Sequence, residues 1–167
     1  MDFSNQFTKI ETDDSLMETV SHGDKAYPFS YYYENLALYD FHCVDWHWHN
    51  EFEFVFVESG EVSCDIGSTH FMLHPGQAIM INSKGLHRFQ SESDAITPNF
   101  LFNPSFISPA ESLIYEKYVN PVLSSSLEYV IFQKDIAWQS VALDIIKNII
   151  KLQDGSDNRE ISVSINV

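Results

Sequence analysis

Basic residues are scarce in this sequence. It has 9 Lys and Arg against 24 Asp and Glu, so the formal net charge is −15 at pH 7 over 167 residues. A surface of that sign repels the phosphate backbone of nucleic acids. The chain itself is therefore not expected to bind DNA or RNA, and any DNA-binding module that accompanies it must lie elsewhere.

Cysteines and long apolar runs are scarce as well. Cys43 and Cys64 are the only cysteines, too few for a disulfide framework, and we interpret them as free thiols of a reducing cytoplasm. The N-terminus lacks the basic region and apolar run of a signal peptide. No apolar run is long enough to span a bilayer. The sequence thus predicts a soluble, cytoplasmic protein without a membrane segment.

Apolar and aromatic residues are plentiful, at 44% and 14% of the chain, and the length suits one domain with a sizeable core. Between about residues 31 and 102 the apolar runs are short and separated by turn residues, which is typical of strands. The expected strands are residues 52–57, 62–66, 70–73, 78–81, 86–89 and 96–102. Short strands at such regular intervals predict a sandwich or a barrel.

A first helix is expected after these strands. The sequence SPAE at residues 108–111 has the form of a capping box with proline at the first helical position. It predicts a helix over residues 108–119 that ends before Pro121, because proline interrupts a helix.

A second helix is expected over residues 135–153, with Gly155 as its stop. Its apolar residues recur at intervals of four and three, as in the seam of a coiled coil. They are Trp138, Ala142, Ile145, Ile149 and Leu152. A helix with this much apolar surface needs a partner. Either it packs on its own β-domain or it pairs across a homodimer, and the sequence leaves both open.

A histidine-rich stretch, HWHNEFE at residues 47–53, carries the most informative chemistry. If residues 46–57 are extended, alternate side chains share a face. The side chains on one such face are His47, His49, Glu51 and Glu53. The other face is apolar, which predicts a strand buried on both sides.

A buried carboxylate is costly unless it is paired or ligates a metal. His47, His49 and Glu53 can form a metal site if His87, on a later expected strand, completes the set. Three imidazoles and a carboxylate suit Fe, Mn, Ni, Zn or Cu. One divalent transition metal, of a kind that the sequence does not specify, is therefore a candidate cofactor.

These residues resemble the two motifs of the cupin superfamily. The first motif has the form HxH, three residues, Glu, six residues, Gly, and it is matched by His47, His49, Glu53 and Gly60. Phe41 replaces the glycine that opens this motif. In the second motif Gly76 and His87 match, whereas Asn82 stands at the usual proline and Lys84 at the second glycine.

Residues 47–89, with FLFNPSFIS at 100–108 and EKYVNPVL at 116–123, are similar to the sensor domain of AraC-type transcription regulators. The resemblance covers about residues 28–153. It implies a mainly β fold, a double-stranded β-helix (cupin) barrel followed by two C-terminal helices. The implied parts are an N-terminal arm (1–26), the barrel (27–103), a helical dimerisation segment (104–155), and a tail (156–167) towards a helix-turn-helix module.

The resemblance leaves three roles open for the His and Glu set: metal ligands, polar groups that hydrogen-bond an organic ligand, or a structural network. Barrels of this family commonly bind a sugar or a related metabolite, so a small-molecule effector is expected. The candidate ligand-binding residues are Trp46, His47, Trp48, His49, Glu51, Glu53 and His87. The residues expected at the surface or rim instead are His22, His42, His70, His74 and Arg88.

Two functions compete at this point. The first is a regulatory binding module that is not an enzyme: the effector changes how the arm or the helices pack, the homodimer forms through residues 135–153, and DNA is bound only by the further module. The second is a metal-dependent cupin enzyme, a dioxygenase, isomerase or epimerase. The sequence offers no separate general acid or base beyond the candidate ligands, which favours the regulator.

Overall fold

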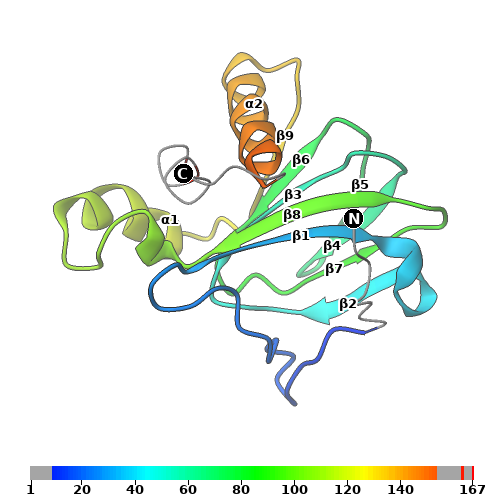
Figure 1. Ribbon diagram of the computed structural model, residues 1–167, viewed down its shortest axis with the longest axis horizontal. Coiled ribbons are helices and arrows are strands. Elements are labelled where there is room, and N and C mark those ends of the chain that lie inside the picture. Colours follow the sequence, from blue (N-terminus) through cyan, green and yellow to red (C-terminus); the bar gives the residue numbers. More distant parts are fainter. Residues whose placement is uncertain (1–8, 154–162, 164–166) are drawn as a thin grey trace.

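The computed structural model describes residues 9–153 and, near the C-terminus, residues 163 and 167. This part of the chain is mainly β, with two antiparallel sheets and two helical regions (Figure 1). The strands are β1 (Phe29–Asn35), β2 (Cys43–His47), β3 (Phe52–Phe56), β4 (Val62–Ile66), β5 (Thr69–Leu73), β6 (Ala78–Ile81), β7 (His87–Gln90), β8 (Ile96–Phe102) and β9 (Tyr129–Phe132). One sheet has the order β1-β8-β3-β6-β9, the other β2-β7-β4-β5. The expected mainly β fold is confirmed, and all six expected strands form.

One apolar cluster lies between the two sheets and a second lies on the outer face of the five-stranded sheet. β3 contributes to both, since Val55 belongs to the first cluster and Phe52 to the second. On the outer face, α2 (Ala137–Leu152) packs against the sheet through Leu143 and Ile146. β3 is therefore apolar on both sides, as its sequence predicts, because both faces of its sheet are covered.

Residues 46–57 do not form one extended strand, contrary to our expectation. β2 ends at His47 in the four-stranded sheet, and β3 begins at Phe52 in the five-stranded sheet. Residues 48–51 therefore cross from one sheet to the other. The histidines and Glu53 converge all the same, because the inner faces of the two sheets look into the same space.

The predicted first helix exists, but its bounds of residues 108–119 are wrong: helical conformation begins at residue 113 and continues past residue 119. The helical elements in this region are the π-helical segment η4 (Tyr115–Val119) and α1 (Asn120–Leu123). The capping serine is Ser112 rather than Ser108, since Ser112 Oγ accepts a 3.0 Å hydrogen bond from the Tyr115 N–H. The chain stays helical through Pro121, which lies at the start of α1, where a missing N–H breaks no hydrogen bond that α1 needs.

The second helix is confirmed, since α2 lies within the expected range of residues 135–153. The helix packs on the sheet of its own β-domain, which is the first of the two alternatives. Part of the predicted seam remains at the surface: Trp138 is 59% exposed and Ile145 38%. The expected stop, Gly155, lies outside the described residues. Among the helices of the described part, none is long and apolar enough to cross a membrane.

Asn82 explains how β9 reaches the edge of the five-stranded sheet. Its side chain is 4% exposed, and its Nδ2 donates to the carbonyl oxygens of Val122 and Leu127 at 2.9 and 2.8 Å. The Asn82 N–H also donates to the Glu128 carbonyl at 2.9 Å. Three hydrogen bonds thus tie the end of β6 to the segment that leads into β9. A proline, which is usual here in the cupin motif, has no N–H or amide to make them.

Two positions where the sequence departs from the cupin motifs have left-handed backbone. The φ angle is 58° at Phe41 and 64° at Lys84. Glycine adopts this region freely, whereas a residue with a Cβ is strained by roughly 1–2 kcal/mol. At Lys84 the turn directs the backbone N–H to the carbonyl of His49, 2.7 Å away. The Phe41 side chain is 90% exposed, so its packing offsets little of the strain.

We expect Phe41→Gly to raise the free energy of unfolding by about 0.5–1 kcal/mol, because relief of the left-handed strain exceeds the added entropy of glycine in the unfolded chain. Urea unfolding of both proteins measures the change. Phe41→Ala is the matched control: it also removes the exposed ring but keeps a Cβ. Equal stabilities of the two variants would show that relief of the strain does not exceed the entropy cost of glycine, contrary to the prediction.

Candidate metal centre and interior cavity

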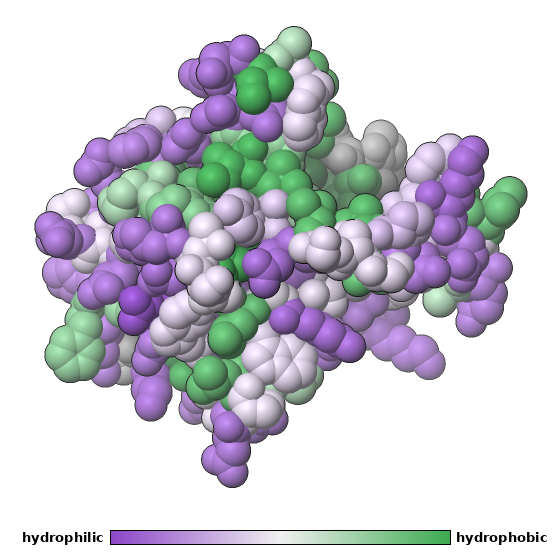
Figure 2. Space-filling view, turned by 180° about the vertical axis from the view of Figure 1, so that it is seen from behind, coloured by the Kyte–Doolittle hydropathy of each residue, from purple (hydrophilic) through white to green (hydrophobic). Residues whose placement is uncertain are grey.

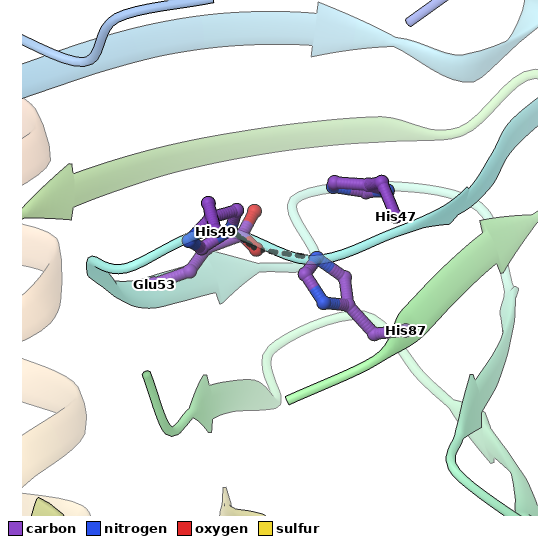
Figure 3. A group of neighbouring side chains, drawn as sticks. All are labelled: His47, His49, Glu53 and His87. Atoms are coloured by element: carbon purple, nitrogen blue, oxygen red, sulfur yellow. Dashed lines mark hydrogen bonds and ion pairs between the residues drawn. The ribbon is translucent and has the colours of Figure 1, made fainter. Parts of the chain in front are cut away.

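Three imidazoles and one carboxylate come together between the sheets (Figure 3). His47 ends β2, His87 begins β7, Glu53 lies on β3, and His49 lies in the crossing between β2 and β3. All four side chains are buried, with exposed fractions from 0% at His87 to 6% at Glu53. One ligand atom from each residue lies within 4.8 Å of the others. The fold thus assembles the four residues that the sequence singles out as metal candidates.

Backbone carbonyls orient two of the imidazoles. His47 Nδ1 lies 2.8 Å from the carbonyl oxygen of Asp45, and His87 Nδ1 lies 2.8 Å from that of Gly85. A carbonyl accepts only, so each Nδ1 must carry the proton and donate it. In the neutral ring the Nε2 atom then has a free lone pair. This is the usual arrangement of a metal-ligating histidine, in which the second nitrogen is held by a backbone acceptor.

Two nitrogens in the cluster lack hydrogen bonds within the described part of the chain. His87 Nε2 lies 2.9 Å from Glu53 Oε2, but an N–H at that nitrogen does not point at the oxygen. His49 Nδ1 is also buried and unpaired, 3.7 Å from Glu51 Oε2. Such atoms are rare in folded proteins and often mark an ion or a ligand. A nitrogen lone pair and a carboxylate oxygen at 2.9 Å repel unless a proton or a metal ion lies between them.

The electrostatics agree with a carboxylate that holds positive charge. Burial by itself raises the pKa of Glu53, but the contacts with His49 and His87 outweigh burial and bring that pKa well below its usual value. Burial lowers the pKa of His87, yet the neighbouring Glu53 carboxylate raises it overall. Burial and the positive charge of His87 together lower the pKa of His47 to about 3. The arrangement therefore favours a negative Glu53 beside a positive charge.

The donor set and its dimensions fit a divalent transition metal. Two ligands on opposite sides of an ion, each about 2.1 Å from it, are about 4.2 Å apart. The four candidate atoms lie within 4.8 Å of one another, so a small contraction would complete the site. His47, His49, Glu53 and His87 are the residues that would hold the ion, and the unpaired Nε2 of His87 would gain a partner.

The other ligand-binding candidates lie around this cluster. Glu51 is at its edge, 3.7 Å from His49. The ring of Trp46 lies against Arg88, whose guanidinium carbon is 5.3 Å from the ring centroid and which pairs with Asp65 at 2.7 Å. Trp46 and Arg88 thus pack on each other. Trp46 is not among the described residues that line the neighbouring cavity.

Trp48 holds the N-terminal segment against the domain. Its backbone N–H donates to the carbonyl of Leu16 at 3.0 Å, and its indole N–H donates to that of Ser15 at 2.9 Å. The Glu18 N–H in turn donates to the Trp48 carbonyl at 2.9 Å. Trp48 stands between the two clustered histidines in the sequence, so the position of the N-terminal segment is tied directly to the backbone of the cluster.

An interior cavity of about 70 Å³ adjoins the cluster, and His47 and Glu53 form part of its wall. The N-terminal segment, residues 9–22, forms another part through Ile10, Glu18 and His22 among others. The apolar wall consists of Leu36, Val44, Val55, Phe89 and Leu101. Polar groups of β1, β8 and their surroundings complete it: Tyr32, Glu34, Tyr39, Thr97 and Asn99. An apolar cavity with a few polar groups is typical of a small-molecule site.

His22 is not a surface or rim residue, contrary to our expectation. It is 8% exposed and lines the cavity. Its Nε2 lies 2.9 Å from Glu18 Oε2, its Nδ1 lies 3.0 Å from Tyr32 Oη, and its ring meets that of His49 edge to face. Its sequence neighbours are polar and show no periodicity, so no local signal indicates its burial. By contrast, His70 and His74 have exposed side chains, at 62% and 55%.

Glu34 is a cavity residue that the sequence does not reveal. Tyr39 Oη donates to one carboxylate oxygen at 2.6 Å, and Asn99 Nδ2 donates to the other at 2.8 Å. Burial is the largest influence on Glu34, and the negative charges of Glu53 and Glu18 act in the same direction, so its pKa rises to about 7. Glu34 belongs to an ordinary aromatic strand in the sequence, and only the pairing of β1 with β8 brings it to Asn99.

Comparison with known proteins assigns the chain to a class of ligand-binding domains. The chain belongs to the AraC-like ligand binding domain family, whose family model matches residues 30–159. It is also 27% identical over 143 residues to an uncharacterized HTH-type transcriptional regulator of Bacillus subtilis, YdeC. That match covers 84% of this chain and 48% of the relative, so the chain spans about half the length of the curated relative. The resemblance to AraC-type regulators is therefore confirmed.

Among solved structures, one shares the fold over most of the chain, and another is similar over less than half of it. Apo ToxT from Vibrio cholerae has a TM-score of 0.53 at 9% identity, over 88% of this chain and 54% of that chain. A cupin-2 domain containing protein from Shewanella frigidimarina has a TM-score of 0.39 at 14% identity, over 44% of this chain and 69% of that chain. At such identities these likenesses concern the fold alone.

We expect the protein, purified without a metal-affinity tag, to contain about one equivalent of a divalent transition metal, and His49→Ala to contain none. Elemental mass spectrometry measures both. His70→Ala is the matched control, because His70 is exposed and pairs only with Asp65. At a free ion concentration of about 100 Kd, metal should raise the free energy of unfolding by about 2.7 kcal/mol. Equal metal content in all three proteins would contradict the site.

Glu34 makes stability depend on pH. Its pKa of about 7 in the folded protein exceeds the ordinary 4.5, so the unfolded chain releases this proton first. Stability therefore falls as pH rises from about 4.5 to about 7 and stays lower above that. We expect Glu34→Gln to be more stable than the parent at pH 7.5, by at most about 3 kcal/mol, and to lose this advantage at pH 5.

Urea unfolding at the two pH values, in the presence of a chelator, measures this difference. Glu58→Gln is the matched control, because Glu58 is exposed and its carboxylate accepts only from Tyr33 Oη among the hydrogen bonds described. A stability difference between Glu34→Gln and the parent that is the same at both pH values would contradict the shifted pKa.

Proposed function

We propose that this chain is the ligand-sensing and dimerisation domain of a bacterial AraC-type transcription regulator, and that it binds a small effector in the cavity between its sheets. The two sheets would be the halves of a double-stranded β-helix. The observation that carries the proposal is the buried His and Glu cluster at the wall of an interior cavity, in a chain of the AraC-like ligand binding domain family.

The effector that we propose is a sugar or a related metabolite. The polar wall offers both donors and acceptors, among them Tyr32, Asn99 and Thr97, and the opposite wall is apolar. Sugars present hydroxyl groups on their edges and C–H groups on their faces, so both kinds of wall would be used. With a metal bound, the cluster would add a Lewis acid that can hold an effector oxygen.

Effector entry requires the N-terminal segment to move. The cavity of about 70 Å³ is less than half of the roughly 150 Å³ that hold benzene in a protein interior. Residues 9–22 form a wall that belongs to neither sheet, and their hydrogen bonds to Trp48 connect them to the cluster. An effector that displaces or holds this segment would thereby shift the protein between two states, as a sensor must.

In this proposal the chain has the parts that the family resemblance implies. They are the arm (1–26), the ligand-binding domain (27–103), the dimerisation segment (104–155) and a tail (156–167) towards a DNA-binding module. DNA would be bound only by that module, because the net charge of −15 repels it here. The match to about half of an HTH-type regulator supports this division, and such a regulator would act in the bacterial cytoplasm.

The homodimer would form through the helix at residues 135–153. On α2 an apolar stripe beside the face that packs on the sheet stays partly exposed, with Trp138 59%, Val141 61% and Ile145 38% exposed. Figure 2 shows apolar surface gathered on the rear face near the top of the molecule, where α2 lies. A stripe at spacings of three and four residues suits pairing with a second helix.

A metal-dependent enzyme is the second candidate, and the three-histidine, one-carboxylate set favours it. We propose the sensor and not the enzyme because the chain belongs to the AraC-like ligand binding domain family. Acids and bases do lie near the cluster, but Glu18 is paired with His22, and Glu34 accepts hydrogen bonds from Tyr39 and Asn99.

A panel of sugars and related metabolites, incubated with the metal-loaded protein, separates the two functions. We expect a sensor to be stabilised against heat by one of them and to release it chemically unchanged, as mass spectrometry of the recovered compound would show. Glu53→Gln should lose this stabilisation, whereas Glu61→Gln, an exposed carboxylate paired with His74, should keep it. Turnover of the compound would instead establish the enzyme.

We expect Val141→Asp to convert the dimer into a monomer in analytical ultracentrifugation, because a charge in the centre of the stripe must be desolvated on pairing. Ser140→Asp, the neighbouring position about 100° around the helix, adds the same charge outside the stripe and should leave the dimer intact. A parent protein that sediments as a monomer would remove α2 as the dimer helix.

A further inference from the structure

The charge of the cavity wall is uneven. Four carboxylates line it, those of Glu11, Glu18, Glu34 and Glu53. Glu18 is paired with His22 at 2.9 Å, and Glu53 lies 2.9 Å from His87. The remaining cation in the wall is the ammonium of Lys9, which is an exposed residue. The interior of the cavity therefore carries more negative than positive charge.

Glu34 is the enclosed carboxylate without a cation. None of the ion pairs formed by the described residues includes it, and its two hydrogen bonds come from the neutral groups Tyr39 Oη and Asn99 Nδ2. The charged groups that act on it most strongly are Glu53 and Glu18, which repel it. Part of its surface stays accessible, and it lies on the cavity wall. Two carboxylate oxygens have about four acceptor sites, so some remain for a ligand.

We propose that the effector of this cavity carries a cationic amino group, which Glu34 binds by a charge-assisted hydrogen bond while the rest of the molecule extends towards the His and Glu cluster. The inference rests on the proposed function, in that it takes the cavity as the effector site. It narrows the effector to amino compounds, such as an amino alcohol or an amino sugar.

The charge of the wall discriminates among three kinds of ligand. An ammonium group relieves the repulsion that Glu34 experiences and gains an ion pair in a place where water screens little. A neutral hydroxyl can donate to Glu34 but leaves its charge uncompensated. An anion meets the carboxylates of Glu18, Glu34 and Glu53 at once and is excluded unless a metal ion holds it.

The alternative is that Glu34 only fastens Tyr39 and Asn99 to each other as part of the fold. A purely structural carboxylate would be replaceable by the amide of the same shape without any effect on ligand choice. The two roles therefore differ in one measurable quantity, the preference of the cavity for a cation over a neutral molecule of equal size.

Ethanolamine and ethylene glycol are a matched pair of probes, because they have the same number of heavy atoms and differ in one ammonium against one hydroxyl group. Both are small enough for the cavity as it stands. Glycolate supplies the corresponding anion. Titrations followed by the amide chemical shifts of isotope-labelled protein give Kd values even for weak binding, with a chelator present so that no metal contributes.

We expect ethanolamine to bind the parent protein about tenfold more tightly than ethylene glycol, since one hydrogen bond to a charged group is gained. In Glu34→Gln the two Kd values should agree within about twofold. In Glu61→Gln, which removes an exposed carboxylate far from the cavity wall, the preference should match that of the parent. Shifts should concentrate in β1 and β8, where Glu34 and Asn99 lie.

Three outcomes would overturn the inference. Equal binding of ethanolamine and ethylene glycol to the parent would show that Glu34 does not select a cation, and the proposed function would stand with a neutral effector. A preference that persists in Glu34→Gln would move the cation site to another carboxylate. An absence of shifts with all three probes would show that the cavity is no amino-compound site, whereas the sensor proposal fails only if the metabolite panel described above also gives no binding.

Discussion

The carboxylate of Glu53 is the constraint on which the centre of this structure depends. It lies 6% exposed between two apolar sheets, and a charge in that position is tolerated only with a positive partner. Three imidazoles surround it, two of them fixed by backbone carbonyls so that their free nitrogens turn inward. The fold thus places three imidazoles around a buried carboxylate, a set that could hold a divalent metal ion.

The cavity beside the cluster also encloses carboxylates that need positive partners. Its wall repeats the pairing of carboxylate and imidazole in Glu18 and His22, but leaves Glu34 with neutral donors alone. An interior with surplus negative charge is less stable than a neutral one, and proteins keep such groups mainly where a ligand compensates them. The N-terminal segment that supplies Glu18 and His22 is bonded to Trp48, between two of the cluster residues. Hydrogen bonds therefore connect the N-terminal wall of the cavity to the backbone of the cluster.

The sheet that carries Glu53 has to be covered on its outer face as well, and α2 does this with one stripe of its surface. Its second apolar stripe remains exposed. The sequence shows which positions of α2 are apolar, but not which of them face the sheet. Residues spaced by three and four positions can form either of two neighbouring stripes, so the spacing does not tell the two stripes apart. The start of the first helix is ambiguous in the sequence as well, because Ser108 and Ser112 are both residues that suit a helix cap. In the structure it is Ser112 that accepts the capping hydrogen bond.

The sequence by itself determined six of the nine strands that the structure describes, the second helix and the four residues of the cluster. Alternation, helical spacing and the HxH motif are local patterns that reflect local physics. It did not determine that residues 48–51 cross between sheets, that His22 and Glu34 line the cavity, or that Phe41 and Lys84 adopt left-handed backbone. Those features arise from contacts between segments far apart in the chain. The pairing of β1 with β8 and the return of the N-terminal segment over the cavity decide them, and no short stretch of sequence records either one.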